Sequence, residues 1–128
     1  MATSTRDDLI DAAISHLTRE GLDGLSLRSI ARDAGVSHAA PARHFDGVAS
    51  LLSGVATRSF DELTATIEHH VDAVPDEPMV RLRAAGEGYL SFAVANRAAY
   101  ELMFRPERLD RTDPEYLRAS VGAFDALK

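Results

Sequence analysis

Apolar residues recur at helical spacing along most of the chain, and no stretch alternates strictly between apolar and polar positions. The clearest pattern lies in residues 48–74, where apolar side chains advance by three or four positions. They are Leu52, Val55, Ala56, Phe60, Leu63, Ile67, Val71 and Val74. Because residues three and four apart share one face of an α-helix, this spacing predicts a long amphipathic helix. We expect an all-α protein.

Six further helices are predicted from the same spacing and from the residues at their ends. We expect them at 6–20, 27–34, 38–44, 79–95, 97–104 and from 114 onward. Thr5, Ser26 and Ser37 are the predicted N-caps of the first three, because their hydroxyls accept hydrogen bonds from free amides of the first turn. Gly21 and Gly35 are predicted to end the first two helices in a left-handed conformation.

Two helices of the C-terminal half are expected to bury an apolar face. In helix 79–95 the expected buried residues are Leu82, Ala85, Tyr89, Phe92 and Ala93. In the last helix they are Leu117, Val121 and Phe124, after a start at Asp113–Pro114 that combines an N-cap with proline at the first helical position.

Pro41 lies inside the third predicted helix. With Ser37 as the N-cap, Pro41 is the fourth helical residue, so its missing N–H removes only the first intrahelical hydrogen bond. Ala40, which precedes the proline, is shifted away from ideal helical geometry. We therefore expect a tight or partly 3₁₀ first turn.

Residues 26–45 combine two short helices, a glycine-containing turn and a local excess of positive charge. Two such helices suit a helix-turn-helix, whose second helix enters the major groove of DNA. The segment holds Arg28, Arg32 and Arg43 but only one acid, Asp33, so its charge is +2 in a chain of −6. A plain corner of a helical bundle is the alternative interpretation, and the local charge favours a nucleic-acid partner.

Residues 9–52 resemble the DNA-binding domain of the tetracycline-repressor (TetR) family of transcriptional regulators. The resemblance is carried by Ala13, Gly21, Leu27, the run IARDAGVS at 30–37, the pair HF at 44–45, and Leu51. Residues 82–104 are similar to the ligand-sensing domain in one branch of that family. The resemblance implies a DNA-binding domain at 1–47 and a helical ligand-sensing and dimerisation domain at 48–128.

The resemblance also implies roles for individual residues. Those that would contact DNA are Ser26, Arg28, Ser37, His38, Ala39, Ala40, Ala42, Arg43 and His44. Those that would line an effector pocket are Phe60, Leu63, Tyr89, Phe92, Asn96, Tyr100, Met103 and Phe104. Many of the second set also suit plain core packing. The implied partners are a palindromic double-stranded operator, a small apolar effector and a second copy of the chain. Effector binding is expected to shift helix 48–74 and lower operator affinity.

Two positions depart from the pattern of the family. The family usually has an aromatic residue where this chain has Ala42, and a lysine where it has Val48. The loss of one cationic phosphate contact lowers the salt slope of binding by about one unit. Both losses together cost on the order of 1–3 kcal/mol. The alternative function is therefore a ligand-binding or protein-interaction module in which DNA binding is weakened or lost.

Family members usually continue for two further helices that build the dimer interface, so we expect a shortened C-terminal domain here. Without those helices, dimerisation would need another interface. A monomer would contact only one half-site and bind DNA poorly.

Other functional classes have little support in the sequence. The absence of cysteine excludes thiolate zinc sites and cysteine nucleophiles. His69 and His70 are adjacent on a helix and point about 100° apart, so they do not chelate one metal together. Asp110, Asp113 and Glu115 flank a helix start and are interpreted as caps. We predict no catalytic residue, metal or cofactor. We also predict a cytoplasmic protein without a membrane segment, because no signal-like start or apolar run of about 20 residues is present.

Overall fold

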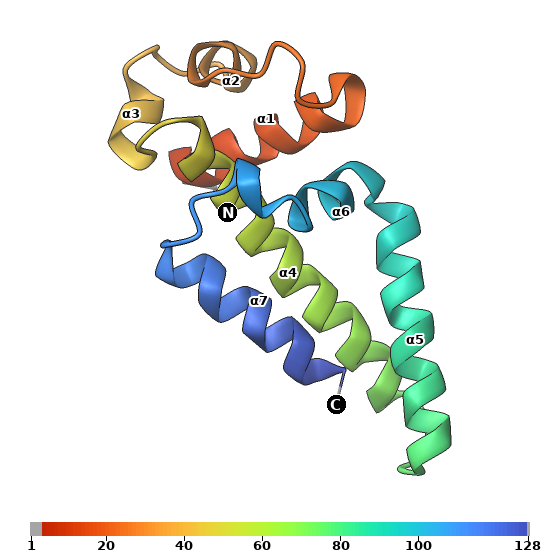
Figure 1. The fold of residues 1–128 in the computed structure, drawn as a ribbon. Coiled ribbons are helices and arrows are strands. Elements are labelled where there is room, and N and C mark those ends of the chain that lie inside the picture. Colours follow the sequence, from red (N-terminus) through yellow and green to blue (C-terminus); the bar gives the residue numbers. More distant parts are fainter. Residues whose placement is uncertain (1–3, 128) are drawn as a thin grey trace.

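The computed structural model describes residues 4–127, which form α-helices and one 3₁₀ turn, confirming the all-α prediction (Figure 1). The head, residues 4–47, contains α1 (Thr5–Glu20), α2 (Leu27–Ala34) and α3 (Ala40–His44). The body, residues 48–127, contains α4 (Val48–Asp72), α5 (Pro78–Ala95), α6 (Arg97–Met103), η1 (Pro106–Arg108) and α7 (Pro114–Ala126). Among the described residues, no helix is both long enough and apolar enough to cross a lipid bilayer.

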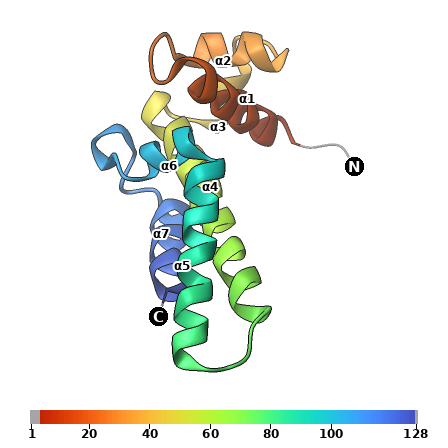
Figure 2. The ribbon, with the colours of Figure 1, turned by 90° about the vertical axis from the view of Figure 1, so that its right-hand side faces the viewer.

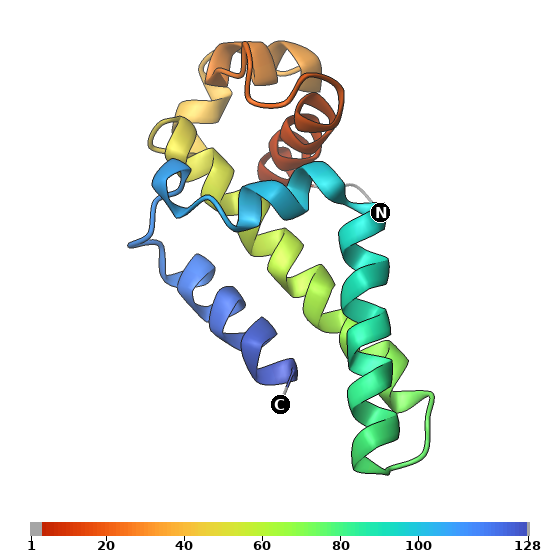
Figure 3. The ribbon, with the colours of Figure 1, turned by 45° about the vertical axis from the view of Figure 1, so that its right-hand side comes forward.

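The long helix α4 connects the two parts. It begins beside the head and runs down the body between α5 and α7, while α6 lies across its upper part and contacts α1 (Figures 1 and 3). The first half of α4 contributes Leu51, Leu52 and Val55 to the hydrophobic core of the head. Its second half contributes residues such as Phe60 and Ile67 to the core of the body. A movement of α4 would therefore change the packing of both cores.

The core of the head also contains residues from the body. Leu102 of α6 and Leu109, which follows η1, are buried with Leu9, Ile10 and Leu17 of α1. The segment from α6 to α7 therefore packs directly against the head, although it lies far away in the sequence.

The first two N-caps show one difference from the prediction. Ser4, not Thr5, caps α1, because the Ser4 hydroxyl accepts a hydrogen bond from the Asp7 amide at 3.1 Å. Thr5 is instead the first helical residue. The cap of α2 is confirmed: Ser26 and Ser29 exchange two side chain–backbone hydrogen bonds of 3.0 Å each, which together form a capping box.

Helix α3 is shorter than predicted. It begins at Ala40 after Ala39, without a side-chain cap, so the prediction that Ser37 caps it was wrong. Pro41 is the second helical residue, where the backbone amide has no intrahelical acceptor, and its ring therefore removes no helical hydrogen bond. The Ala40 amide donates to the Ser37 carbonyl at 3.1 Å, a contact three residues back that confirms the tight first turn.

The predicted buried face of α7 is exposed, and in α5 the prediction was wrong for Leu82, whereas Ala85 and Phe92 are buried as predicted. Leu82 of α5 is 59% exposed, and Leu117, Val121 and Phe124 of α7 are between 47% and 58% exposed. The residues of α5 and α7 that face α4 are mostly small: Ala84, Ala85, Gly88, Ala119 and Ala123. Small side chains allow helix backbones to approach closely, and most of the larger apolar residues of α5 and α7 are then left outside.

Candidate nucleic-acid interface

Helices α2 and α3 lie at the end of the molecule opposite the α4–α5 connection (Figure 2). Gly35 ends α2 at φ 72°, ψ 29°, and the following amide, that of Val36, donates to the Ala31 carbonyl at 3.0 Å. Only glycine adopts this left-handed geometry at little cost, and it turns the chain sharply into α3. Ile30 and Ala31 are fully buried and anchor α2 on the head. This is the geometry of a helix-turn-helix.

Eight of the nine predicted DNA-contacting residues are exposed. They are Ser26, Arg28, Ser37, His38, Ala39, Ala42, Arg43 and His44. Ala40 is the exception, because it is only 7% exposed and the neighbouring Pro41 is buried as well. The prediction that Ala40 lines the DNA-facing surface is therefore corrected: the proline turn directs it into the head.

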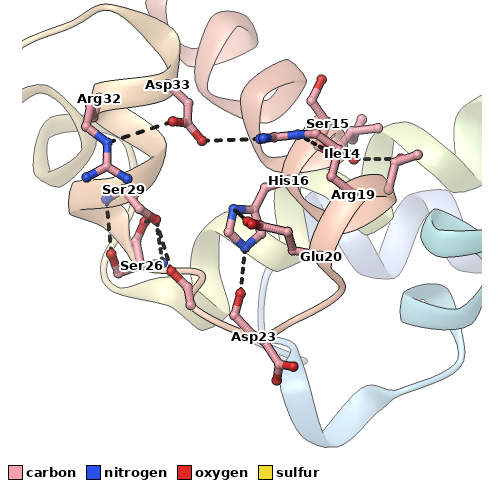
Figure 4. A network of polar contacts seen from close by, with 12 residues as sticks. Ile14, Ser15, His16, Arg19, Glu20, Asp23, Ser26, Ser29, Arg32 and Asp33 are labelled. Atoms are coloured by element: carbon pink, nitrogen blue, oxygen red, sulfur yellow. Dashed lines mark hydrogen bonds and ion pairs between the residues drawn. The ribbon is translucent and has the colours of Figure 1, made fainter.

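Two arginines of this surface have free guanidinium groups. Among the described residues, neither Arg28 nor Arg43 forms an ion pair, whereas the Arg32 guanidinium lies 3.9 Å from the Asp33 carboxylate. Asp33 also lies 3.5 Å from Arg19 of α1, so it is shared between two cations (Figure 4). The unpaired arginines are the ones available to an anionic partner such as a phosphate.

The junction of α1, α3 and α4 includes a cation that the sequence pattern did not indicate. The Arg6 guanidinium lies 5.2 Å from the centre of the Phe45 ring, and Phe45 itself is buried. A Cβ atom at Gly54 of α4 would lie 3.2 Å from both Ile10 and Phe45. Only the close approach of these helices places Arg6 beside the end of α3, so no local signal could have identified it.

Several predicted effector residues meet in an aromatic cluster formed by Phe60, Tyr89, Tyr100, Phe104 and Tyr116. The Phe60 ring centre lies 6.0 Å from that of Phe104 and 6.2 Å from that of Tyr116. The rings of Tyr100 and Phe104 lie 5.0 Å apart. Phe104 is 45% exposed, so the cluster reaches the surface there.

Two tyrosine hydroxyls of this cluster are paired. The oxygens of Tyr89 and Tyr100 lie 2.6 Å apart, and the two rings are nearly perpendicular. Burial, together with this hydrogen bond, raises the pKa of Tyr89 to about 12. The Tyr89 hydroxyl is therefore neutral at physiological pH, and the hydroxyl pair could orient a polar group of a small molecule.

The other predicted effector residues have different surroundings. Leu63, Phe92 and Met103 are buried in the core of the body. The Asn96 side-chain amide donates to the Phe92 carbonyl at 3.0 Å, at the end of α5. Asn96 also lines a groove of about 470 Å³ between α1 and the α5–α6 junction. No group of three His, Asp or Glu side chains in the described part of the chain is placed to hold a metal ion.

Residues 9–55 match the family described as bacterial regulatory proteins, tetR family. The chain is 30% identical over 122 residues to an uncharacterised HTH-type transcriptional regulator of Mycobacterium tuberculosis, a match that covers 95% of this chain and 55% of the relative. It is 33% identical over 79 residues to the HTH-type transcriptional regulator BetI of Burkholderia thailandensis, which covers 62% of this chain and 40% of that protein. The chain thus spans about half the length of these relatives.

Solved structures show the same arrangement of helices. A protein of unknown function from Rhodococcus sp. RHA1 superposes with a TM-score of 0.84 at 37% identity, covering 97% of this chain and 64% of the other. A TetR family transcription regulator from Marinobacter aquaeolei superposes with a TM-score of 0.73 at 14% identity, covering 95% and 64% of the two chains. The second likeness concerns the fold alone.

Proposed function

We propose that this chain is a DNA-binding transcriptional regulator of the tetR family and that it acts as a ligand-responsive repressor. The match of residues 9–55 to that family supports the proposal. The observation that carries the proposal is the exposed surface of α2 and α3, with Arg28 and Arg43 unpaired at the tip of the head. The named relatives are regulators, which supports a non-enzymatic role. A role at DNA also supports the cytoplasm as its location.

In the proposed complex, α3 lies in the major groove of a palindromic operator. Arg43 and His44 approach phosphates, and the Ser26 hydroxyl, whose oxygen already accepts the Ser29 amide, still has its own proton to donate. His38, Ala39 and the exposed Ala42 are the residues of this surface that can reach base edges. The DNA-binding domain is proposed to end at residue 47, with α4 as its connection to the sensing domain.

A palindromic site requires two copies of the head. The exposed apolar side chains of α5 and α7 support contact with further polypeptide, because a monomer in water rarely leaves such faces uncovered. We propose a homodimer whose two α3 helices enter successive major grooves. This arrangement doubles the contact area and gives the operator its symmetry.

The aromatic cluster is the proposed effector site. It combines apolar rings with the Tyr89–Tyr100 hydroxyl pair, a combination typical of sites for small apolar molecules. Phe60 lies on α4, which also contributes to the core of the head. A ligand that moves this part of α4 would change the separation of the two heads and lower operator affinity by a population shift.

A second candidate function is favoured by two residues of the head. Ala42 is exposed and offers no aromatic contact, and Val48 is half-buried against the core of the head and offers no cation. With these two contacts missing, the chain would be a ligand-binding or protein-interaction module with weak DNA binding.

Selection from random-sequence duplex DNA, at low and then at physiological salt, tests both functions. We would compare the natural chain with an Ala42→Tyr/Val48→Lys variant, in which the apolar stem of the lysine can cover the core as Val48 does. An enriched palindrome bound by the natural chain supports the regulator. Binding by the variant alone supports a weakened DNA-binding protein. If a dimeric chain binds nothing in either form, the regulator is excluded.

A matched pair of variants tests the surface itself. Arg28→Ala/Arg43→Ala removes the two arginines of the α2–α3 surface that form no ion pair with a described residue, and it is expected to lower DNA affinity at every sequence, with a salt slope smaller by about two units. Arg83→Ala/Arg97→Ala removes the same charge from α5 and α6 of the body and is expected to leave binding nearly unchanged.

A further inference from the structure

A furrow runs between the head and the body where α6 contacts α1 (Figure 3). It consists of two adjoining grooves, of about 330 Å³ and about 470 Å³, which share Leu17, Ala98 and Glu101 as lining residues. The head lines this α1–α6 furrow with α1 and the loop that follows it, and the body lines it with the end of α5, α6 and η1. None of the residues of the aromatic cluster lines either groove, so the furrow is separate from the proposed effector site.

The smaller groove combines an apolar floor with two arginines. Leu17 and Leu102, which line it, are 5% and 2% exposed, and Leu22 beside them is half-buried. The same groove is lined by Arg105 and Arg108, whose side chains are exposed. Neither arginine forms an ion pair with any residue in the range 4–127. Both guanidinium groups are therefore available to a ligand that reaches the apolar floor.

The charges of the furrow favour an anion. Its ionisable lining residues are three arginines and two acids: Arg97, Arg105, Arg108, Asp23 and Glu101. Glu101 lies 3.4 Å from Arg97, so these two charges compensate each other. Two cations then remain beside one acid, in a chain whose net charge is −6. Guanidinium groups form their strongest hydrogen bonds with carboxylates and phosphates.

The apolar floor selects among the possible anions. A bare phosphate ion would meet the two arginines but would leave the leucine side chains in contact with water. A carboxylate attached to an apolar ring would satisfy both parts of the groove. Sites for small molecules are typically about 300–1,000 Å³ in volume and combine apolar lining with a few polar groups that fix orientation. The smaller groove has this composition and lies at the lower end of this range, which suits a ligand with a single ring.

Both walls of the furrow are held by contacts that do not involve a ligand. On the side of the head, the Asp23 carbonyl oxygen lies 2.8 Å from Nε2 of His16, which is only 4% exposed. Nδ1 of the same ring lies 3.3 Å from Oε2 of Glu20. On the side of the body, the Arg108 amide donates to the Arg105 carbonyl at 3.0 Å. A site whose walls are already in place loses less affinity to the ordering of loops on binding.

We propose that the α1–α6 furrow is a second small-molecule site, which binds a carboxylate attached to a single apolar ring. Arg105 and Arg108 bind the carboxylate, and the ring covers Leu17, Leu22 and Leu102. Because such a ligand contacts the head and the body at once, it fixes the position of one relative to the other. Binding in the furrow does not depend on the proposed function.

The first test is an NMR titration of ¹⁵N-labelled protein with benzoate, in a buffer that contains neither phosphate nor another carboxylate. We expect saturable shifts of the amides of Leu22, Ala98 and Arg105, which lie on both sides of the furrow. Benzyl alcohol keeps the ring without the charge, and inorganic phosphate keeps the charge without the ring, so both should bind more weakly. Equal affinity for either of them would overturn the proposed ligand class. Shifts confined to Tyr89 and Tyr100 would assign benzoate to the aromatic cluster and overturn the furrow site.

A matched pair of variants tests the role of the arginines. Arg105→Gln/Arg108→Gln should weaken benzoate binding about fivefold, a modest change because both side chains are exposed to solvent. Arg83→Gln/Arg111→Gln removes the same charge from positions outside the furrow and should leave benzoate affinity unchanged. All four side chains are exposed, so both variants should fold. An equal loss in the two variants would show general attraction of an anion and would overturn the site.

Binding to random-sequence duplex DNA, measured on the same natural chain, separates this site from the proposed function. If benzoate shifts the furrow amides but the chain binds no DNA, the furrow site stands and the proposed function fails. If the chain binds DNA but benzoate leaves the furrow amides unchanged, the furrow site fails and the proposed function stands.

Discussion

The head and the body bury their apolar side chains to different extents. In the head, residues such as Leu9, Ile10 and Ile30 are almost completely buried. Large apolar side chains that are clearly exposed occur, among the described residues, only from α5 onward: Met79, Leu82, Leu90, Val94, Phe104, Leu117, Val121, Phe124 and Leu127. The large apolar side chains of the head are thus covered, whereas the body exposes apolar surfaces suited to further contacts.

The difference arises from the residues at the helix contacts. The head packs large aliphatic side chains of α1, α2 and α4 against one another. In the body, α4 meets Gly88 of α5 and Ala119 and Ala123 of α7. Most of the larger apolar residues of α5 and α7 consequently point outward, and Phe92 of α5 is the buried exception.

Polar contacts of α4 supplement the apolar core that the head shares with the body. Arg58 of α4 binds Asp7 and Asp11 of α1, and Ser53 bonds to the backbone of Asp110. Further down, Arg118 of α7 makes two hydrogen bonds to Asp61, of 3.0 and 3.1 Å. The Arg58 contacts join the body to the head, whereas the other two hold the segment after η1 and α7 against α4 within the body.

The largest expected effect contrasts two apolar side chains. Ile30→Ala in the head leaves a cavity at a fully buried position and should lower the free energy of unfolding by about 2–5 kcal/mol. Leu82→Ala in the body removes a side chain that is 59% exposed and should cost less than about 0.5 kcal/mol. Urea denaturation measures both, and similar losses would contradict the difference between the two parts.

The close contact between α4 and α5 can be tested with two glycines of α5. A Cβ atom at Gly88 would lie 3.0 Å from the Ile67 Cα and 3.1 Å from the Thr66 carbonyl oxygen, so Gly88→Ala should destabilise the body by about 1–3 kcal/mol. Gly86 has no atom within 4 Å of such a Cβ, so Gly86→Ala should stabilise the helix by about 0.5–1 kcal/mol. Thermal unfolding measures the two changes, and a shift of the same sign in both would argue against the tight helix pair.

The attachment of the α6–α7 segment is tested at Ser53, which is fully buried. Its hydroxyl oxygen accepts the Asp110 amide at 2.6 Å, and the hydroxyl donates to the Asp110 carbonyl at 3.1 Å. Ser53→Ala leaves both backbone groups without this partner and should cost about 1–2 kcal/mol. Hydrogen exchange at the Asp110 amide should accelerate, and Ser91→Ala, on an exposed position of α5, serves as the control.

The smallest expected effect concerns alkaline pH. The raised pKa of Tyr89, about 12, means that the phenol ionises more readily in the unfolded chain, where its pKa is near 10. Stability from this group is therefore complete below pH 10 and is lost as the pH rises toward 12. Tyr100→Phe removes the hydrogen bond that helps to raise this pKa, so Tyr89 should ionise at lower pH in an ultraviolet absorbance titration. An unchanged titration would show that the Tyr100 hydroxyl has no part in raising the pKa.

Local sequence chemistry was sufficient to predict the helices, most of their ends and the helix-turn-helix. Periodicity and glycine act within a few residues, so Gly35 and Ser26 could be placed without knowledge of the remainder of the fold. Ser37 was misassigned because Pro41 favours the first turn of a helix and so moved the start of α3.

Tertiary structure alone decided which faces are buried and which polar groups meet. Periodicity marks an apolar stripe but does not say whether another helix covers it, so Leu117, Val121 and Phe124 were predicted to be inside. Alanine and glycine lie at the contacts with α4 because the helix backbones approach one another closely there. How closely they approach depends on the partner helix and not on the sequence of α4 alone. The burial of Ala40 and the contacts of His16 likewise depend on the packing of residues brought together by the fold.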